Sequence, residues 1–380
     1  MGSDSPLGLY IHIPFCRAKC TYCDFNSYPG QEALFEDYTT ALVWEMEQVG
    51  RAQVHTIYVG GGTPTVLPLS HLARILRQVQ MCFAAKSDAE VSLEANPGTV
   101  GSVLLAGLRA LGVNRLSLGV QSFDDQELRL LGRIHTAAEA VKAFGAAREA
   151  GFENINLDLI YGLPKQSLAT WQTTLAGAVA LAPEHLSLYA LSVEEGTPLA
   201  GQIARGALPQ PDPDLGAEMY EVAEEVLATE GYVHYEISNW ARDEAHRCLH
   251  NLGYWRNEAY LGLGAGAHSW RGGRRWANLA SPQAYIAAVL AGKRPVATEE
   301  AIGAELEMGE TMMMGLRLLD EGVAYERFRA RFGCDLRQRY AAEMAELAQL
   351  DLIETDAHRV RLSRRGRLLG NQVFMRFLPD

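Results

Sequence analysis

Residues 10–23 read Tyr-Ile-His-Ile-Pro-Phe-Cys-Arg-Ala-Lys-Cys-Thr-Tyr-Cys and place Cys16, Cys20 and Cys23 in a C-x3-C-x2-C pattern. Three thiolates can hold three irons of a cubane 4Fe–4S cluster, which leaves the fourth iron open to a small molecule. A structural zinc site would use four protein ligands, and no fourth Cys or His follows at a suitable distance. The alternative is three reduced cysteines in the core of a cytosolic protein. The spacing alone leaves that alternative open, and the rest of the chain argues against it.

The composition bounds the class of protein. The chain has 380 residues, of which 48% are hydrophobic, enough for one large domain and a smaller one. A net charge of -12 argues against a general nucleic-acid binder. Six cysteines are too sparse for a disulfide scaffold. Residues 1–6 carry no pattern of a secretory signal, and no apolar run is long enough to span a membrane. We therefore expect a cytoplasmic protein.

Short apolar strands alternate with longer helical segments over the first part of the chain. This order predicts a parallel sheet curled into a partial (β/α)6 barrel of the TIM type, with one side open. The predicted strands cover residues 7–13, 56–59, 91–95, 115–120, 156–161 and 185–193. The predicted helices cover residues 34–49, 69–83, 137–150, 168–181 and 215–230.

We divide the chain into a barrel (1–231), an irregular bridging segment rich in aromatics, Gly and Asn (232–300), and a C-terminal domain (301–380). Predicted helices over 301–319, 324–332 and 336–350, a two-strand pattern and a last helix from Ser363 are typical of a winged-helix module. Residues 320–380 hold 11 Arg against 10 acidic residues. This near balance favours a solvated or docking surface, and we expect no nucleic-acid partner.

Polar residues collect where the predicted strands end, which is where a β/α barrel places its site. They are Gly60-Gly61-Gly62-Thr63, Glu94, Gln121, Arg133 and Asp158. A glycine triplet lets the backbone approach a ligand closely, although it is often only a sharp turn. Each polar residue alone is more typical of a structural hydrogen bond. Together with the cysteine loop, they predict a cofactor site.

The chain resembles the radical S-adenosylmethionine proteins of the oxygen-independent coproporphyrinogen III oxidase family. The resemblance rests on the motifs above, together with Glu-Ala-Asn-Pro at 94–97 and Gly-Val-Gln-Ser-Phe at 119–123. The resemblance runs from residue 9 into the C-terminal domain. It implies that S-adenosylmethionine chelates the open iron and is cleaved by an electron from the cluster. By match, the residues contacting S-adenosylmethionine would be Tyr10, Tyr22, Gly61, Gly62, Thr63, Glu94, Gln121, Arg133 and Asp158.

Two departures place the chain in one branch of that family. The oxidases carry a further Cys two residues after the third cysteine, whereas this chain has Phe25 at that position. They also carry an extension before the Tyr-x-His-x-Pro-Phe-Cys motif, whereas Tyr10 lies close to the start of this chain. Both resemble the HemW branch, whose members bind haem and pass it to other proteins. That branch also carries the His-Asn-x-x-Tyr-Trp motif, present here as His250-Asn251-Leu252-Gly253-Tyr254-Trp255.

His250 has two interpretations, which we weigh equally. Its imidazole can ligate haem iron, with flat aromatic faces beside it for the porphyrin. Alternatively, it is hydrogen-bonded within a packed loop that closes the open side of the barrel. Cys248 is a weaker candidate ligand.

The main hypothesis is a haem chaperone with a 4Fe–4S cluster, S-adenosylmethionine and haem as cargo. Its partners would be haem-accepting apoproteins, including those of membrane respiratory complexes. The alternative is an oxygen-independent coproporphyrinogen III oxidase. The sequence leaves open the oligomeric state, a homodimer included, and a peripheral association with the membrane.

Overall fold

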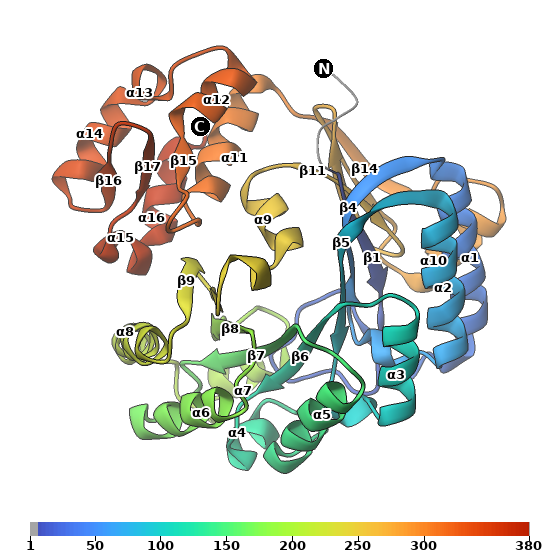
Figure 1. The fold of residues 1–380 in the computed structure, drawn as a ribbon. Coiled ribbons are helices and arrows are strands. Elements are labelled where there is room, and N and C mark those ends of the chain that lie inside the picture. The colour runs from blue at the N-terminus through green and yellow to red at the C-terminus, as the bar shows by residue number, and fades with distance from the viewer. Residues whose placement is uncertain (1–6, 380) are drawn as a thin grey trace.

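Residues 7–379 are described by a computed structural model, in which helices cover the outer side of a strongly curved sheet (Figure 1). Residues 1–6, on which the expectation about a secretory signal rests, lie outside the described part. The sheet has twelve strands, and six consecutive ones run parallel in chain order. These six are β1 (Leu7–Ile13), β4 (Ala52–Gly61), β5 (Phe83–Ala95), β6 (Arg115–Gln121), β7 (Ile155–Tyr161) and β8 (His185–Ala190).

The prediction of six parallel strands in an open α/β barrel is confirmed. The strands are buried runs of apolar residues on the face that meets the helices, as parallel strands covered by helices require. In β1, the outward-facing Leu9, Ile11 and Ile13 are fully buried. The inward-facing residues of the same strands are mostly polar, so polar side chains line the barrel interior.

The segment 232–300, which we expected to be irregular, is largely regular. It supplies six strands that extend both edges of the sheet. One of them pairs in parallel with β1, with Gly8 opposite Tyr260, and the others are antiparallel. Short antiparallel strands with one solvent-facing side lack the continuous apolar run of a buried strand, which explains the error. The six are β9 (Val233–Glu236), β10 (Asn239–Ala241), β11 (Ala259–Leu263), β12 (His268–Arg271), β13 (Arg274–Asn278) and β14 (Val296–Ala301).

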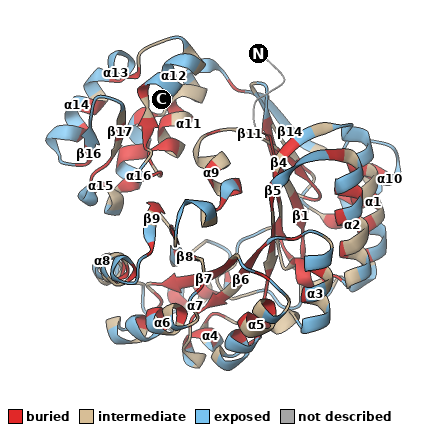
Figure 2. Cartoon of the chain, viewed as in Figure 1, coloured by how far each residue is buried: buried red, intermediate tan, exposed pale blue. Residues whose placement is uncertain are grey.

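Helices cover the outer face of the sheet, and Figure 2 shows buried residues concentrated on the strands and on the helix sides that face them. Local signals start several of these helices: Thr136 and Glu139 form a capping box at α5, and Ser167 caps α6. The covering helices are α1 (Phe35–Val49), α2 (Leu69–Cys82), α3 (Ser102–Ala110), α4 (Asp125–Leu130), α5 (Ala137–Glu149), α6 (Leu168–Ala180), α8 (Pro213–Thr229) and α10 (Pro282–Leu290).

The C-terminal part forms a second hydrophobic core of its own, with Phe328, Leu347 and Val360 among its buried residues. A three-stranded sheet packs with short helices, consistent with the predicted helical, winged-helix-like module. Its strands are β15 (Val323–Ala324), β16 (Ile353–Thr355) and β17 (Arg359–Leu362). Its helices are α11 (Ala304–Gly315), α12 (Tyr325–Phe332), α13 (Leu336–Arg339), α14 (Ala341–Gln349), α15 (Arg364–Leu368) and α16 (Gly370–Phe374).

Two expected helices differ in detail. The helix predicted over 336–350 is broken at Tyr340, whose backbone leaves helical geometry while its buried ring packs against Phe377. The helix predicted from residue 301 begins at Ala304, because Ala301 is the last residue of β14 and pairs with Arg274. In both cases a tertiary contact outweighs local helical propensity. No helix of residues 7–379 has the length and apolar character needed to cross a bilayer.

Candidate functional site

The three cysteines lie on one loop at the carboxyl end of β1. Cys16 closes the short strand β2 (Phe15–Cys16), which pairs with β3 (Tyr28–Pro29), and the loop between them carries Cys20 and Cys23. The Thr21 N–H donates to the carbonyl of Leu131 at 3.0 Å and the Thr21 hydroxyl donates to that of Leu130 at 2.8 Å. The loop is therefore anchored to the end of α4 rather than free in solvent.

Each sulfur has a polar neighbour suited to a thiolate. Cys16 Sγ lies 3.5 Å from Thr63 Oγ1, Cys23 Sγ lies 3.9 Å from Ser27 Oγ, and Arg133 Nη1 donates to Cys20 Sγ at 3.3 Å. Hydrogen bonds to sulfur stabilise the negative charge of cluster ligands. Three cysteine thiols with donors beside them fit a cubane cluster with one open iron.

A site for a single metal ion would need side chains that converge on one point, which is a different geometry from that of a cubane cluster. No group of three or more His, Cys, Asp or Glu side chains within residues 7–379 is placed to hold one metal ion. In a cubane cluster each thiolate binds a different iron, so the sulfurs need not converge on one point.

The glycine triplet packs against the cysteine loop. The Gly62 N–H donates to the carbonyl of Ile13, and the Thr63 N–H donates to that of Phe15, both at 2.8 Å. A Cβ on Gly62 would lie 2.6 Å from the Phe15 oxygen and 3.0 Å from Cys16 Sγ. Gly61 has φ of 114° and its Cβ would strike the ring of His12. Glycine is thus required here by a close approach and by a left-handed conformation.

Two carboxyl groups face the barrel interior. Glu94 accepts hydrogen bonds from the hydroxyl of Tyr58 at 2.8 Å and the N–H of Gly61 at 3.0 Å. Burial raises the pKa of Glu94 to about 7. Asp158 accepts from Ser117 at 3.0 Å and Asn156 at 2.8 Å, and burial raises its pKa as well. These hydrogen bonds hold both carboxyl groups in fixed positions along the wall.

Gln121 and Arg133 meet at the end of β6. Gln121 has φ of 70°, an unusual conformation for a residue with a side chain. The Gln121 amide and the Arg133 guanidinium both approach Gly119, whose carbonyl accepts from Arg133 Nη2 at 2.6 Å. Arg133 Nε is buried without a partner among the described residues. An unpaired buried donor beside a cysteine sulfur is the kind of group that a bound ligand satisfies.

The remaining matched residues lie on the same face. Tyr10 projects into the interior from β1, and its hydroxyl lies 2.9 Å from His12 Nδ1. Tyr22 packs with Leu131, Ile160 and Leu163 beside the cysteine loop. The structure therefore gathers the predicted residues from separate strands inside the barrel, where Tyr10 also lies near His250, with ring centroids 6.5 Å apart.

The His250 motif forms α9 (Leu249–Trp255), which sits inside the open side of the curved sheet (Figure 1). His250 is 3% exposed, and burial lowers its pKa to about 3. Its Nδ1 lies 2.9 Å from Thr56 Oγ1 and its Nε2 lies 3.1 Å from the Tyr254 hydroxyl. In this conformation the histidine is the hydrogen-bonded residue of the second interpretation, with neither ring nitrogen free.

His250 and the cysteines lie at opposite ends of the barrel. The His250 ring faces Gly8 near the start of β1, whereas Ile13 ends that strand beside the cysteine loop. At 3.3 Å per residue, five residues correspond to about 17 Å along the strand. A ligand on His250 would be distinct from one on the cluster.

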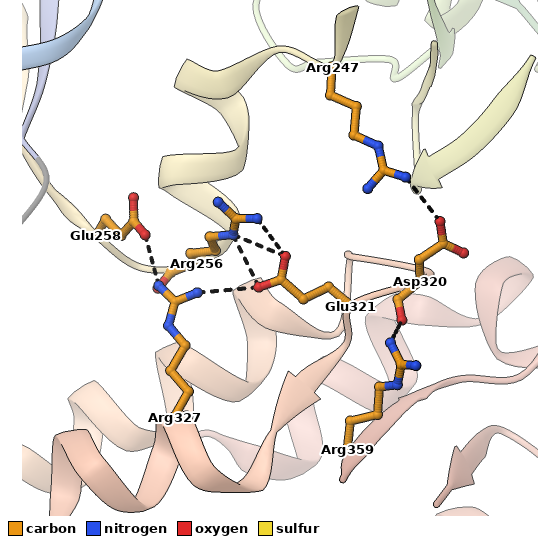
Figure 3. A network of polar contacts seen from close by, with 7 residues as sticks. All are labelled: Arg247, Arg256, Glu258, Asp320, Glu321, Arg327 and Arg359. Carbon is orange, nitrogen blue, oxygen red and sulfur yellow. Dashed lines mark hydrogen bonds and ion pairs between the residues drawn. The ribbon is translucent and has the colours of Figure 1, made fainter. Parts of the chain in front are cut away.

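Both flanks of α9 are held by charged groups. The Glu90 carboxylate, on β5, accepts the N–H groups of Leu249 at 2.7 Å and His250 at 3.2 Å. At the other end, Arg256 makes a bidentate ion pair with Glu321 at distances from 2.7 to 3.1 Å. Figure 3 shows the wider network, in which Asp320, Glu321 and Arg327 of the C-terminal domain pair with Arg247, Arg256 and Glu258 around α9. Arg359 donates to the Asp320 carbonyl within the C-terminal domain.

Other arginines of the C-terminal domain are also paired. Arg367 and Arg364 contact Glu224 on α8, and Arg361 contacts Glu354. Arg364 and Arg367 therefore join the C-terminal domain to α8, whereas Arg361 is paired within its own domain.

Sequence reasoning missed Thr56, Tyr58, Glu90 and Arg115, which also line the interior. Their signal was present, because they occupy alternate positions of strands whose other residues are apolar. Which of them meet depends on strand register, which the sequence did not give.

Comparison with known proteins identifies relatives of this chain. Residues 10–176 match the Radical SAM superfamily and residues 304–369 match the HemN C-terminal domain. The heme chaperone HemW of Bacillus subtilis (strain 168) is 39% identical over 376 residues, covering 98% of this chain and 99% of that protein. Heme chaperone HemW of Mycobacterium tuberculosis (strain ATCC 25618 / H37Rv) is 40% identical over 375 residues, covering 97% and 94%. Among solved structures, coproporphyrinogen III oxidase (HemN) from Escherichia coli, described as a radical SAM enzyme, has a TM-score of 0.85 and 26% identity, covering 99% of this chain and 91% of that one.

Proposed function

The chain belongs to the HemW family of radical S-adenosylmethionine proteins, and we propose that it is a haem chaperone, which binds haem and passes it to haem-requiring proteins. The observation that carries this proposal is the similarity to heme chaperones HemW over almost the whole of both chains. The acceptors would be haem-requiring apoproteins, with those of membrane respiratory complexes among them.

We assign a 4Fe–4S cluster to Cys16, Cys20 and Cys23. The support is the set of donors at the three sulfurs and the anchoring of the loop to α4. When bound, such a cluster supplies an electron to S-adenosylmethionine held on its open iron. The protein's part is to hold the three thiolates and to neutralise them, chiefly through Arg133.

We assign S-adenosylmethionine to the space beside this loop. The carboxyl groups of Glu94 and Asp158 suit ribose hydroxyls or an ammonium, and an aromatic ring such as Tyr22 suits the adenine face. Backbone N–H and C=O groups near the glycine turn can orient the methionine part. The full set is Tyr10, Tyr22, Gly61, Gly62, Thr63, Glu94, Gln121, Arg133 and Asp158.

His250 is our candidate for the haem ligand. Its Nε2 is bonded to the Tyr254 hydroxyl, so rotation of that phenol would free the nitrogen for iron. Thr56 would keep its hydrogen bond to Nδ1 and fix the ring, as partners of metal-bound histidines do. Because His250 is buried, haem can reach its Nε2 only if the end of α9 that carries Tyr254 moves aside. Such a movement would strain the ion pairs between α9 and the C-terminal domain.

A second candidate function is oxygen-independent coproporphyrinogen III oxidation, favoured by the likeness to HemN over nearly the whole chain. Phe25 argues against it, since it stands where the resemblance to the oxidases requires a cysteine. Phe25 is 66% exposed on the cluster loop, and its side chain has no group that can ligate a metal or transfer a proton.

Anaerobic protein with a reconstituted cluster separates the two functions. Titration with haem is expected to give one bound haem per chain by its Soret band, and His250→Ala is expected to weaken that binding. Incubation with coproporphyrinogen III, S-adenosylmethionine and a reductant is expected to give no protoporphyrinogen. Catalytic formation of protoporphyrinogen without stoichiometric haem binding would establish the oxidase instead.

A further inference from the structure

A buried cation in the barrel wall has no direct partner among residues 7–379. Arg115, the first residue of β6, is 2% exposed, and its Nε is enclosed without a hydrogen-bond acceptor. Within residues 7–379 its guanidinium makes no ion pair and no hydrogen bond. Enclosing a charge without a partner costs several kcal/mol. A protein retains such a group when something else satisfies it.

The nearby carboxylate does not fill that role. Glu90 lies close enough to favour the charged form of Arg115, but its oxygens are already engaged. They accept from Leu249 N, His250 N and the Ser92 hydroxyl, and the Cys248 thiol lies 3.6 Å away. Burial alone would lower the pKa of Arg115, yet the groups around it raise that pKa overall, so the guanidinium stays charged. Among residues 7–379, Arg115 Nε is therefore left without an acceptor, as a group that a bound ligand would satisfy.

Arg115 also neighbours the candidate haem ligand. After burial and His55, its charge is a cause of the lowered pKa of His250. Thr56, which contacts the His250 ring, lies on β4, and Arg115 lies two strands away on β6. Two strand spacings amount to about 10 Å. The ring of Tyr58 stacks on His250 with centroids 5.1 Å apart, and its hydroxyl is among the groups that act on the charge of Arg115, so Tyr58 links the two residues.

We propose that Arg115 binds a propionate carboxylate of haem inside the barrel, while His250 faces the iron. This inference rests on the proposed haem-binding function. Haem carries propionate groups on one edge of a flat macrocycle, and a guanidinium forms paired hydrogen bonds with a carboxylate. The arrangement gives the chain a means to fix the orientation of haem and to select a ligand with a free acid edge.

The test compares haem with haem dimethyl ester, whose propionates carry no charge, by Soret titration of cluster-loaded protein. Arg115→Met is expected to weaken haem binding by ten- to a hundred-fold and to leave the ester's affinity unchanged. Arg115→Lys keeps a single charge and is expected to retain a preference for the free acid, reduced several-fold. Arg51→Met, an exposed arginine in the loop before β4, serves as the control and is expected to bind both ligands as the wild type does.

Circular dichroism of each variant separates loss of folding from loss of binding, and Arg115→Lys carries the test if Arg115→Met does not fold. Wild-type affinity of a folded Arg115→Met for haem would overturn the inference, and so would equal losses for haem and ester. A folded Arg115→Lys without preference for the free acid would overturn it too. If the wild-type chain binds neither ligand, the proposed function and this inference are overturned together. If the wild type binds haem and the Arg115 variants bind it equally well, only the inference is overturned.

Discussion

Replacement of Gly62 by alanine tests how the glycine turn supports the cluster loop. The added Cβ would lie 2.6 Å from the carbonyl oxygen of Phe15 and 3.0 Å from Cys16 Sγ. The first of these atoms is backbone and also accepts the N–H of Thr63 at 2.8 Å. It cannot swing aside as the end of a flexible side chain could. Relief of the clash therefore has to displace the strand that carries Cys16.

The size of the effect follows from these distances. Ordinary van der Waals contact begins at 3.4 Å, so the two segments must separate by about 0.8 Å. Overpacking of this kind costs about 1–3 kcal/mol, and a weakened hydrogen bond between the segments adds about 1 kcal/mol. We expect the free energy of unfolding to fall by about 2–4 kcal/mol and the cluster to assemble incompletely, because Cys16 is displaced from its place relative to Cys20 and Cys23.

The assay is iron and sulfide content per chain after anaerobic reconstitution, together with urea unfolding of the apoprotein. Gly145→Ala is the matched control, because Gly145 lies within α5 and a Cβ there meets no atom within 4 Å. That control should keep its cluster and gain about 0.5–1 kcal/mol of stability from the lower entropy of the unfolded chain. Full iron content and unchanged unfolding in Gly62→Ala would refute the reasoning.

Three further predictions follow from single groups. Cys20→Ser should abolish the absorbance of the reconstituted cluster, and retention of full iron content would remove Cys20 from the ligand set. Glu321→Gln leaves Arg256 and Arg327 without their shared carboxylate and should lower the free energy of unfolding by about 1–2 kcal/mol in low salt. The loss should be smaller in high salt, because salt screens the ion pairs. Glu354→Gln removes a more exposed pair and should change the free energy of unfolding by less than about 0.5 kcal/mol. Glu236 is fully buried and burial raises its pKa to about 8, so the folded state holds a proton that the unfolded state releases above about pH 4.3. The free energy of unfolding should therefore fall as the pH rises from about 4.3 to 8. In urea unfolding, Glu236→Gln should be more stable than the wild type at pH 8 but not at pH 4. A difference that does not depend on pH would contradict the raised pKa of Glu236.

The parallel core of the fold could be predicted because its strands leave a strong local signal. Runs such as Leu7–Ile13 are buried on the helix side, and turn residues bound them, so their number and order were accessible from the sequence. The family resemblance is confirmed by the comparisons. By contrast, β11 to β14 were missed. β11 has only five residues, one of them Gly262, and β13 and β14 carry exposed polar residues that resemble a loop in composition.

Some parts of the candidate site could likewise be predicted from the sequence, and others could not. The cysteines lie together at residues 16–23 and the glycines at residues 60–62, so each motif was readable from its own spacing. The contacts of His250 with Thr56 and Glu90 join residues about 194 and 160 positions apart, and only the strand register and the placement of α9 decide them. The sequence therefore identified His250 as a candidate ligand but could not reveal that both its nitrogens are engaged.

Transfer of haem is the most direct test of the central claim. Haem-loaded chain would be mixed anaerobically with an apoprotein that needs haem for activity, and the two would be separated after incubation. The account predicts that the Soret band leaves the chain, that the acceptor gains activity in proportion, and that free haem at the same concentration acts more slowly. A chain that keeps its haem in the presence of acceptors, and that converts coproporphyrinogen III with many turnovers, would contradict the account.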